Sequence, residues 1–237
     1  MDQNIVEFGV KNVHVWPIIS EDADTGAPTY GEVIAFPSAR SISLEAQGDI
    51  NRYYADNKEW WSSTTGSGTY EGDFNFYHMP PRFEQEVLMM LKNKDGVTAE
   101  GTDPKFEPRY YALAFEFEGD ANAVRHLFYR VKSTRPQVTG NTTEENKEPE
   151  ERSISLAASA RKDTGLVRVK CSEGDDAYDD WYEAPYEYVE TEYEAVQEPT
   201  GNPSTSGYYE LVNDVYYPSE DTTVDATKTY YTVKTTP

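Results

Sequence analysis

The chain has 237 residues, a formal net charge of −22, 37% hydrophobic residues and 14% aromatic residues. Its length allows one large domain or a domain with an appendage, and its aromatic content is typical of a folded protein rather than a disordered one. The strong negative charge argues against a nucleic-acid-binding protein, because neutralising phosphates takes clustered Lys and Arg.

The cysteine content and the hydropathy of the sequence indicate the compartment in which the chain folds. Cys171 is the only cysteine, which excludes an intrachain disulfide and argues against the disulfide-rich secreted class. The first residues show neither the basic nor the apolar region of a signal peptide, and no apolar run approaches membrane-spanning length. We therefore predict a protein that folds in a reducing cytoplasm and makes no membrane contact.

Alternation of apolar and polar residues predicts a mainly β region over residues 1–171. In 111–118, aromatic and aliphatic side chains alternate with small and acidic ones, which indicates a half-buried strand. A turn and a second alternating segment at 125–132 predict its antiparallel hairpin partner. Further strands are predicted at 41–45, 70–77, 153–158 and 166–171.

One amphipathic helix is predicted between these strands. Pro80-Pro81 precedes it, and Lys92, Lys94 and Gly96 mark its expected end. Its predicted packing face consists of Phe83, Val87, Met90 and Leu91. Such a stripe is expected to pack against a sheet, with an inter-subunit surface as the alternative.

Two polar stretches, 56–69 and 135–152, are predicted to be long loops. The first contains Trp60 and Trp61, which either fill the domain's own core or dock on a neighbouring subunit. We treat this stretch as a candidate inter-subunit loop.

The C-terminal region differs in composition. Residues 172–206 are acidic and rich in tyrosine, and we interpret them as a connector after a 1–171 domain. A small β meander is predicted over 207–237, with Asn213-Asp214 at its first turn and a third strand at 229–233. Three short strands are marginally stable alone, so this meander is expected to pack against the 1–171 domain or against a neighbouring molecule.

The sequence offers no pattern typical of catalysis. The histidines match no zinc spacing, and no nucleophile elbow, phosphate loop or dinucleotide fingerprint occurs. The segment 22–26 hints at a calcium loop but lacks its full ligand spacing, so an Asx turn is predicted there. We therefore expect no enzyme activity, no cofactor and no metal.

The order of the predicted segments resembles the major tail protein (tail tube protein) family of long-tailed phages of Gram-positive bacteria. The resemblance covers nearly all of residues 4–171. It is carried by the segments 4–16, 37–45, Tyr54-Ala55-Asp56-Asn57, Tyr70-Glu71-Gly72-Asp73-Phe74, the helix, 111–119, 125–136 and 152–156. No single motif is specific; the order and spacing of the set carry the resemblance. The tyrosine-rich tail from about 201 looks like a segment appended to various phage structural proteins.

The resemblance implies a tail-tube-type β-sandwich or barrel with a flanking helix. It also implies a homo-hexameric ring that stacks into a hollow tube, with tape-measure, initiator and terminator proteins as partners. DNA would pass without specific binding, in a virion assembled in the host cytoplasm. Because a basic wall would bind phosphates, we expect acidic side chains to line the lumen. The candidate lumen-facing residues are Glu116, Glu118, Glu71 and Asp73.

Two other functions stay open from the sequence. A monomeric carbohydrate-binding or adhesive β module would also be acidic, aromatic and poor in cysteine. A hydrolase on a β scaffold would need a constrained pair of acids in a cleft, which the sequence gives no reason to expect.

Overall fold

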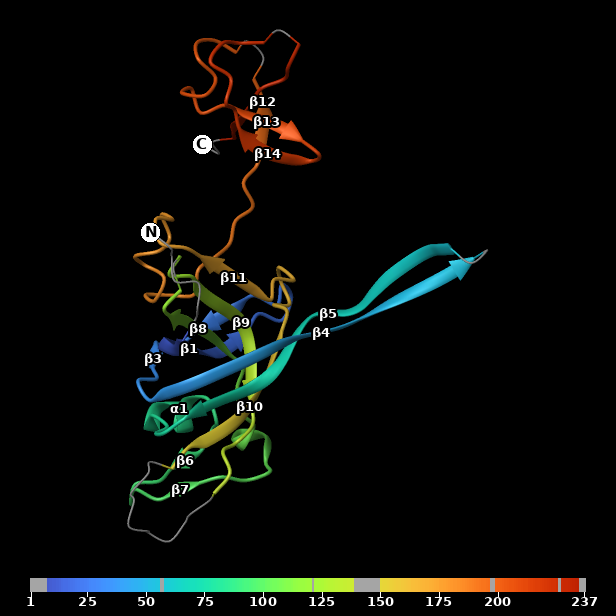
Figure 1. The fold of residues 1–237 in the computed structure, drawn as a ribbon. Helices are drawn as coiled ribbons and strands as arrows, with labels where there is room; N and C mark the ends of the chain where they lie inside the picture. Colours follow the sequence, from blue (N-terminus) through green and yellow to red (C-terminus); the bar gives the residue numbers. More distant parts are fainter. Residues whose placement is uncertain are drawn as a thin grey trace. The chain divides into compact units, whose positions relative to one another are not determined.

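The computed structural model of the chain describes residues 8–55, 58–120, 122–138, 150–196, 199–225 and 227–234. The chain divides into two compact units, Met1–Tyr186 and Glu187–Pro237. Figure 1 shows the strands of both units and, in the first, the one α-helix found in the described residues. The division falls after Tyr186, later than the predicted division after Cys171.

The first unit is built on one antiparallel sheet. Its strands are β1 (Phe8–Glu21), β2 (Pro28–Tyr30), β3 (Ile34–Ala35), β4 (Ala39–Ala55), β5 (Lys58–Phe76), β8 (Tyr111–Glu118), β9 (Arg125–Ser133), β10 (Arg152–Ser159) and β11 (Arg168–Cys171). They pair in the order β2-β1-β8-β9-β10-β5-β4, with β3 added to β1 and β11 added to β9. Within the described residues β4 lies close to β1 without pairing to it, so the sheet curls round a core but stays open. This architecture confirms the predicted mainly β, sandwich-type fold.

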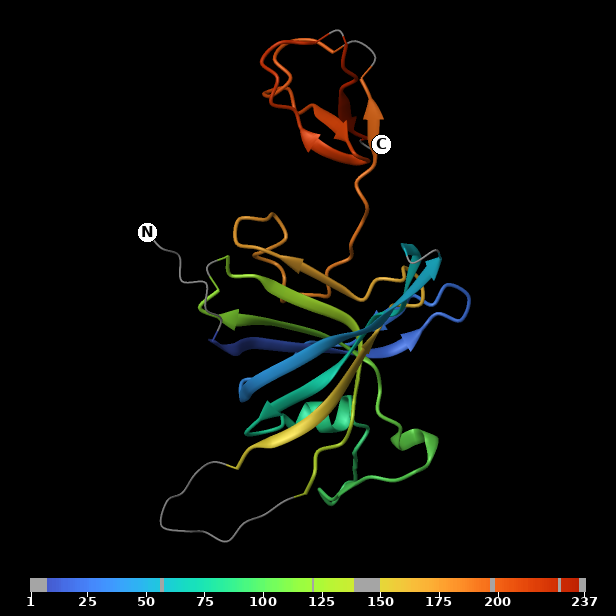
Figure 2. The ribbon, with the colours of Figure 1, turned by 45° about the vertical axis from the view of Figure 1, so that its right-hand side comes forward.

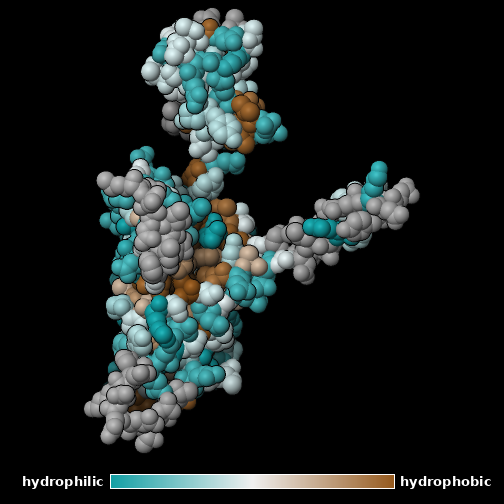
Figure 3. Space-filling view, in the orientation of Figure 1, coloured by the Kyte–Doolittle hydropathy of each residue, from teal (hydrophilic) through white to brown (hydrophobic). Residues whose placement is uncertain are grey.

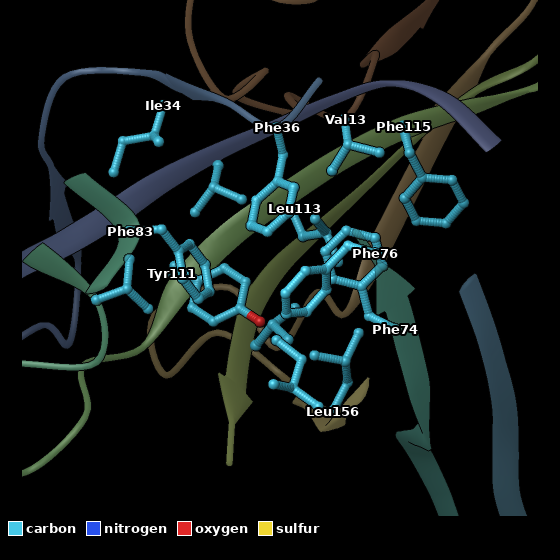
Figure 4. Close-up of a cluster of buried hydrophobic side chains, with 14 of the residues drawn as sticks. Val13, Ile34, Phe36, Phe74, Phe76, Phe83, Tyr111, Leu113, Phe115 and Leu156 are labelled. Carbon is cyan, nitrogen blue, oxygen red and sulfur yellow. The ribbon is translucent and has the colours of Figure 1, made fainter. Parts of the chain in front are cut away.

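Aromatic rings fill the core inside the curled sheet, as Figure 4 shows. The Phe36 ring lies 4.9 Å from Phe74 and 5.1 Å from Phe76, in edge-to-face geometry with both. Phe74 and Phe76 alternate along β5 with polar residues on the outer face, which is the pattern that predicted this strand. Each fully buried ring contributes about 2–3 kcal/mol to the free energy of unfolding.

The helix is shorter than the sequence predicted. Helix α1 spans Pro81–Glu86, and Met89 just beyond it has a left-handed backbone conformation (φ 55°), which redirects the chain. The chain then forms the two-stranded sheet of β6 (Leu91–Lys92) and β7 (Thr98–Ala99), followed by the 3-10 helix η1 (Pro104–Phe106). Gly96, taken as a marker of the helix end, lies in the turn between β6 and β7 with φ 85°.

A second apolar cluster covers the opposite face of β8 and β9. Trp16, Ala112, Tyr129 and Trp181 are buried in it, and Trp181 comes from the segment after β11. Figure 2 shows this segment next to β9. Strand β8 is therefore buried on both faces, whereas the sequence indicated a half-buried strand. Residues 172–186 belong to the first unit and do not form a free connector.

The second unit contains a four-stranded antiparallel sheet. Its strands are β12 (Tyr193–Ala195), β13 (Tyr209–Val212), β14 (Val215–Pro218) and β15 (Tyr231–Val233). Asn213 and Asp214 both have positive φ, so the predicted turn between β13 and β14 is confirmed. The sheet order is β12-β15-β13-β14, so the predicted meander is wrong in its order, and β12 was not foreseen.

Candidate functional site

The first unit carries a two-stranded arm formed by the far ends of β4 and β5. In the part of the chain that the structure describes, residues 47–55 of β4 and 58–69 of β5 pair with each other and with no other strand, because β10 reaches β5 only from Tyr70 onward. Figure 1 shows this arm leaving the rest of the sheet. Gly68, with φ 108°, lies where the register of the two strands shifts, and such a backbone conformation favours glycine.

Large aromatic side chains on the arm are exposed to solvent. Trp60 is 80% exposed, Trp61 56% and Tyr53 53%. Tyr53 and Trp61 face each other across the two strands, with ring centroids 5.2 Å apart. The predicted loop at 56–69 is therefore wrong for 58–69, which form a strand, while 56 and 57 lie outside the described residues. Trp60 and Trp61 do not fill this subunit's core, and their inter-subunit role stays a prediction.

Glu71 and Asp73 lie side by side on the outer face of β5. Both are exposed, and their neighbours on the same strand, Phe74 and Phe76, point to the core. Ser155 Oγ of β10 donates a hydrogen bond to Asp73 Oδ1 over 3.0 Å. With Lys132, these residues line a shallow groove where β5, β10 and β9 meet. Both carboxylates are exposed in the isolated subunit, and their lumen-facing role stays a prediction.

Glu116 has a different environment. It is only 4% exposed, and its carboxylate accepts hydrogen bonds from Asn12 Nδ2 (2.6 Å) and Arg125 Nε (3.0 Å). Lys11 Nζ lies 3.4 Å away. A buried carboxylate with these partners supports the fold and offers little charge to a channel, which counts against a lumen-facing Glu116. Glu118, two residues on, is exposed at the end of β8.

Arg125 links this carboxylate to the covering segment. Its guanidinium lies 3.6 Å from the centre of the Tyr178 ring and 4.8 Å from that of Tyr182, and it donates to the Tyr178 carbonyl. Burial raises the pKa of the Tyr182 phenol, with the nearby Glu116 charge acting in the same direction. This contact was not predicted from the sequence. The small residues Ala112 and Ala114 on the second face of β8 were the available signal, since they leave room for a covering layer.

The predicted packing face of the helix is only partly reproduced. Phe83 and Val87 are buried in the core, and Met90 packs against it partly buried. Leu91 is exposed and lies in β6, beyond the helix. The left-handed turn at Met89 breaks the helical spacing on which the four-residue stripe depended.

Two further polar sites of the first unit are His126 and the turn at Asp22. His126 is half-buried on β9, where burial, followed by the charges of Arg168 and Lys170, lowers its pKa to about 4. Asp22 Oδ1 accepts hydrogen bonds from the backbone of Asp24 and Thr25, as expected of an Asx turn. Within the described residues no cluster of three His, Cys, Asp or Glu side chains is placed to hold a metal, and no helix is long and apolar enough to cross a membrane.

Comparison with protein-family models identifies a match for this chain. A family model described as phage tail tube protein matches residues 16–184, which is more than half of the chain. The matched range ends close to Tyr186, where the first structural unit ends. A search of curated proteins finds no match.

Proposed function

The chain belongs to the phage tail tube proteins, a major tail protein family of phages of Gram-positive bacteria, and from this premise we propose that it polymerises into the tail tube as stacked hexameric rings. Genomic DNA passes through the lumen of that tube during ejection. Proteins of this family are structural, and the mechanism that we propose is passive passage without a chemical step.

The arm is the observation that carries this proposal. An isolated two-stranded ribbon is marginally stable in water, and this one exposes three large aromatic rings, those of Tyr53, Trp60 and Trp61. Both features favour an arm that is covered by a neighbouring subunit. A contact between an arm on one copy and a different surface on the next is heterologous, and such contacts close into rings or continue as filaments.

Strand edges supply a second type of contact. The main sheet is open, with β2 and β4 as its terminal strands. Terminal strands present backbone groups that pair readily with a strand from another chain. In a ring, edge pairing between neighbours would extend the sheet from subunit to subunit and form the tube wall.

The lumen is proposed to be lined by exposed carboxylates. Glu71, Asp73 and Glu118 meet the requirement of exposure in the subunit. Like charges on the wall keep the DNA duplex away from it, whereas lysines would bind phosphates by counterion release and slow transit. A ring structure with these side chains on its outer surface would remove this part of the proposal.

The proposed partners are copies of the same chain and the proteins that begin, measure and end a tail, namely initiator, tape-measure and terminator proteins. The proposed place is the virion tail, assembled in the host cytoplasm. The second unit carries ten Asp or Glu and two Lys, and we place it outside the lumen, because charge of this density in a channel would repel itself and the DNA.

Electron microscopy with light scattering over a concentration series tests the proposal. Wild-type protein should form rings or hollow tubes of uniform width. Trp60→Ser should raise the concentration needed for assembly by about 30-fold, which corresponds to a typical interface hot spot of about 2 kcal/mol. Val97→Ser is the matched control, because Val97 is also exposed but lies off the arm. Monomers at every concentration, even with the tail initiator complex added, would contradict the proposal.

A further inference from the structure

The second unit presents one sheet face that bears no charged side chain. The register places Tyr193, Tyr209, Tyr216 and Tyr231 on this face, together with Ala195, Leu211, Pro218 and Val233. We call this set the tyrosine face. The opposite face carries charge: Lys228 Nζ lies 2.9 Å from carboxylate oxygens of both Glu210 and Asp221. Figure 3 shows a hydrophobic area on the otherwise mostly hydrophilic surface of this unit.

The four tyrosine rings form one interlocked cluster. Tyr193 and Tyr216 stack with ring centroids 4.1 Å apart. Tyr209 packs edge-on against Tyr193, and Tyr231 edge-on against Tyr216, each at 5.0 Å. All four rings are partly exposed. Because the rings hold one another in place, a ligand that binds them has little side-chain freedom to remove.

We propose that the tyrosine face binds a neutral polysaccharide composed of sugars with equatorial hydroxyl groups. Such sugars have an apolar C–H face, which suits the electron-rich face of an aromatic ring, and hydroxyl groups, which suit the phenolic oxygens of the same tyrosines. Four strands at about 4.8 Å spacing give a shallow surface about 14 Å wide, suited to an extended chain rather than to a single small molecule.

The net charge of the second unit favours a neutral polysaccharide over a second copy of the unit or an anionic polymer as the ligand. The unit has a net charge of −8, from ten acidic residues and two lysines. Two such units would repel each other face to face, and an anionic polymer would be repelled as well. A neutral polysaccharide meets no such barrier.

Affinity per subunit is expected to be weak, because the face is shallow. If the subunits form a tube, as proposed above, many copies bind one polymer together and the avidity rises by orders of magnitude. The increase with assembly therefore rests on the proposed function, whereas binding by a single subunit does not.

The test uses the full-length unassembled protein and a hexamer of β-1,4-linked N-acetylglucosamine as the probe, with binding followed by NMR titration. Leu211 and Val212 form a matched pair, because they are adjacent on β13, 40% and 49% exposed, and point to opposite faces. Wild type and Val212→Glu should bind with a dissociation constant on the order of 1 mM, and Leu211→Glu at least about tenfold more weakly. Both substitutions lie at exposed sites, and NMR spectra will show whether the unit stays folded.

The outcomes separate this proposal from the proposed function. No binding by the wild type at about 10 mM probe, or equal binding by both variants, overturns the inference. So does a change of oligomeric state with Leu211→Glu, since the face would then be a protein interface. Tubes without glycan binding contradict only this inference, whereas glycan binding without tubes contradicts only the tube.

Discussion

Removal of the Arg125 side-chain charge should lower the free energy of unfolding of the first unit. Arg125→Met keeps much of the side-chain length but leaves the Glu116 carboxylate in its buried site with Asn12 and the more exposed Lys11 as remaining partners. Breaking a buried ion pair from one side costs about 3–5 kcal/mol. Because Lys11 stays near the carboxylate, we expect a loss of about 2–4 kcal/mol in the free energy of unfolding.

The measurement is urea unfolding followed by tryptophan fluorescence. All four tryptophans lie in the first unit, so the signal reports this unit and not the second. The double variant Glu116→Gln/Arg125→Met removes both charges and should recover at least about 1 kcal/mol relative to Arg125→Met. Arg168→Met is the matched control, because Arg168 is exposed on β11, and it should cost less than about 1 kcal/mol.

Two results would refute this reasoning. A loss below about 1 kcal/mol for Arg125→Met would mean that Glu116 is hydrated, and thus that the segment 172–186 does not cover β8 in solution. A double variant no more stable than Arg125→Met would mean that the two charges are not coupled.

Three further predictions follow from single contacts. The hydrogen bond from Arg130 holds the pKa of Glu21 below its ordinary value of 4.5. This carboxylate therefore adds stability above pH 4.5 that is lost as the pH falls through its lower folded pKa. Glu21→Gln should flatten the dependence of the urea midpoint on pH in this range, and an unchanged slope would contradict the role given to Glu21. A Cβ atom on Gly72 would lie 2.7 Å from the backbone carbonyl carbon of Ser43, so Gly72→Ala should lower the free energy of unfolding by at least about 2 kcal/mol, measured by urea unfolding. In the control Gly9→Ala the new Cβ meets nothing within 4 Å, and the loss should be less than about 1 kcal/mol. Asp214 has φ 63°, a backbone conformation that glycine adopts more readily than aspartate. Asp214→Gly should therefore stabilise the second unit by about 0.5–1 kcal/mol, measured as slower amide hydrogen exchange in β13 and β14. The control Glu220→Gly should not slow this exchange.

The sequence predicted the strands of the core well because their alternation has one buried and one exposed face. Phe74 and Phe76 alternate with acidic and amide side chains, and period-two burial is a local property of the strand. The turn at Asn213-Asp214 was found for a similar reason, since both residue types tolerate positive φ.

Elements that depend on distant contacts were not predictable in the same way. The polar strand segment 58–69 pairs with β4, and its Ser, Thr and Gly residues favour a loop when the partner strand is not known. The cover over β8 comes from 172–186, far along the chain, so Glu116 looked like an exposed strand residue. The helix end was missed because it depends on the backbone of Met89, a residue type that rarely adopts positive φ.

The boundary near Tyr186 also offers an engineering site. The family match ends at 184, the first unit ends at Tyr186, and the described residues that follow, 187–192, are exposed. A fusion joint placed there cuts through neither sheet, so an unrelated folded domain can be joined in place of the second unit with both β-sheets of the first unit left whole. In a polymer of this chain, every subunit would then carry one copy of the passenger, and the length of the assembly would set the number displayed.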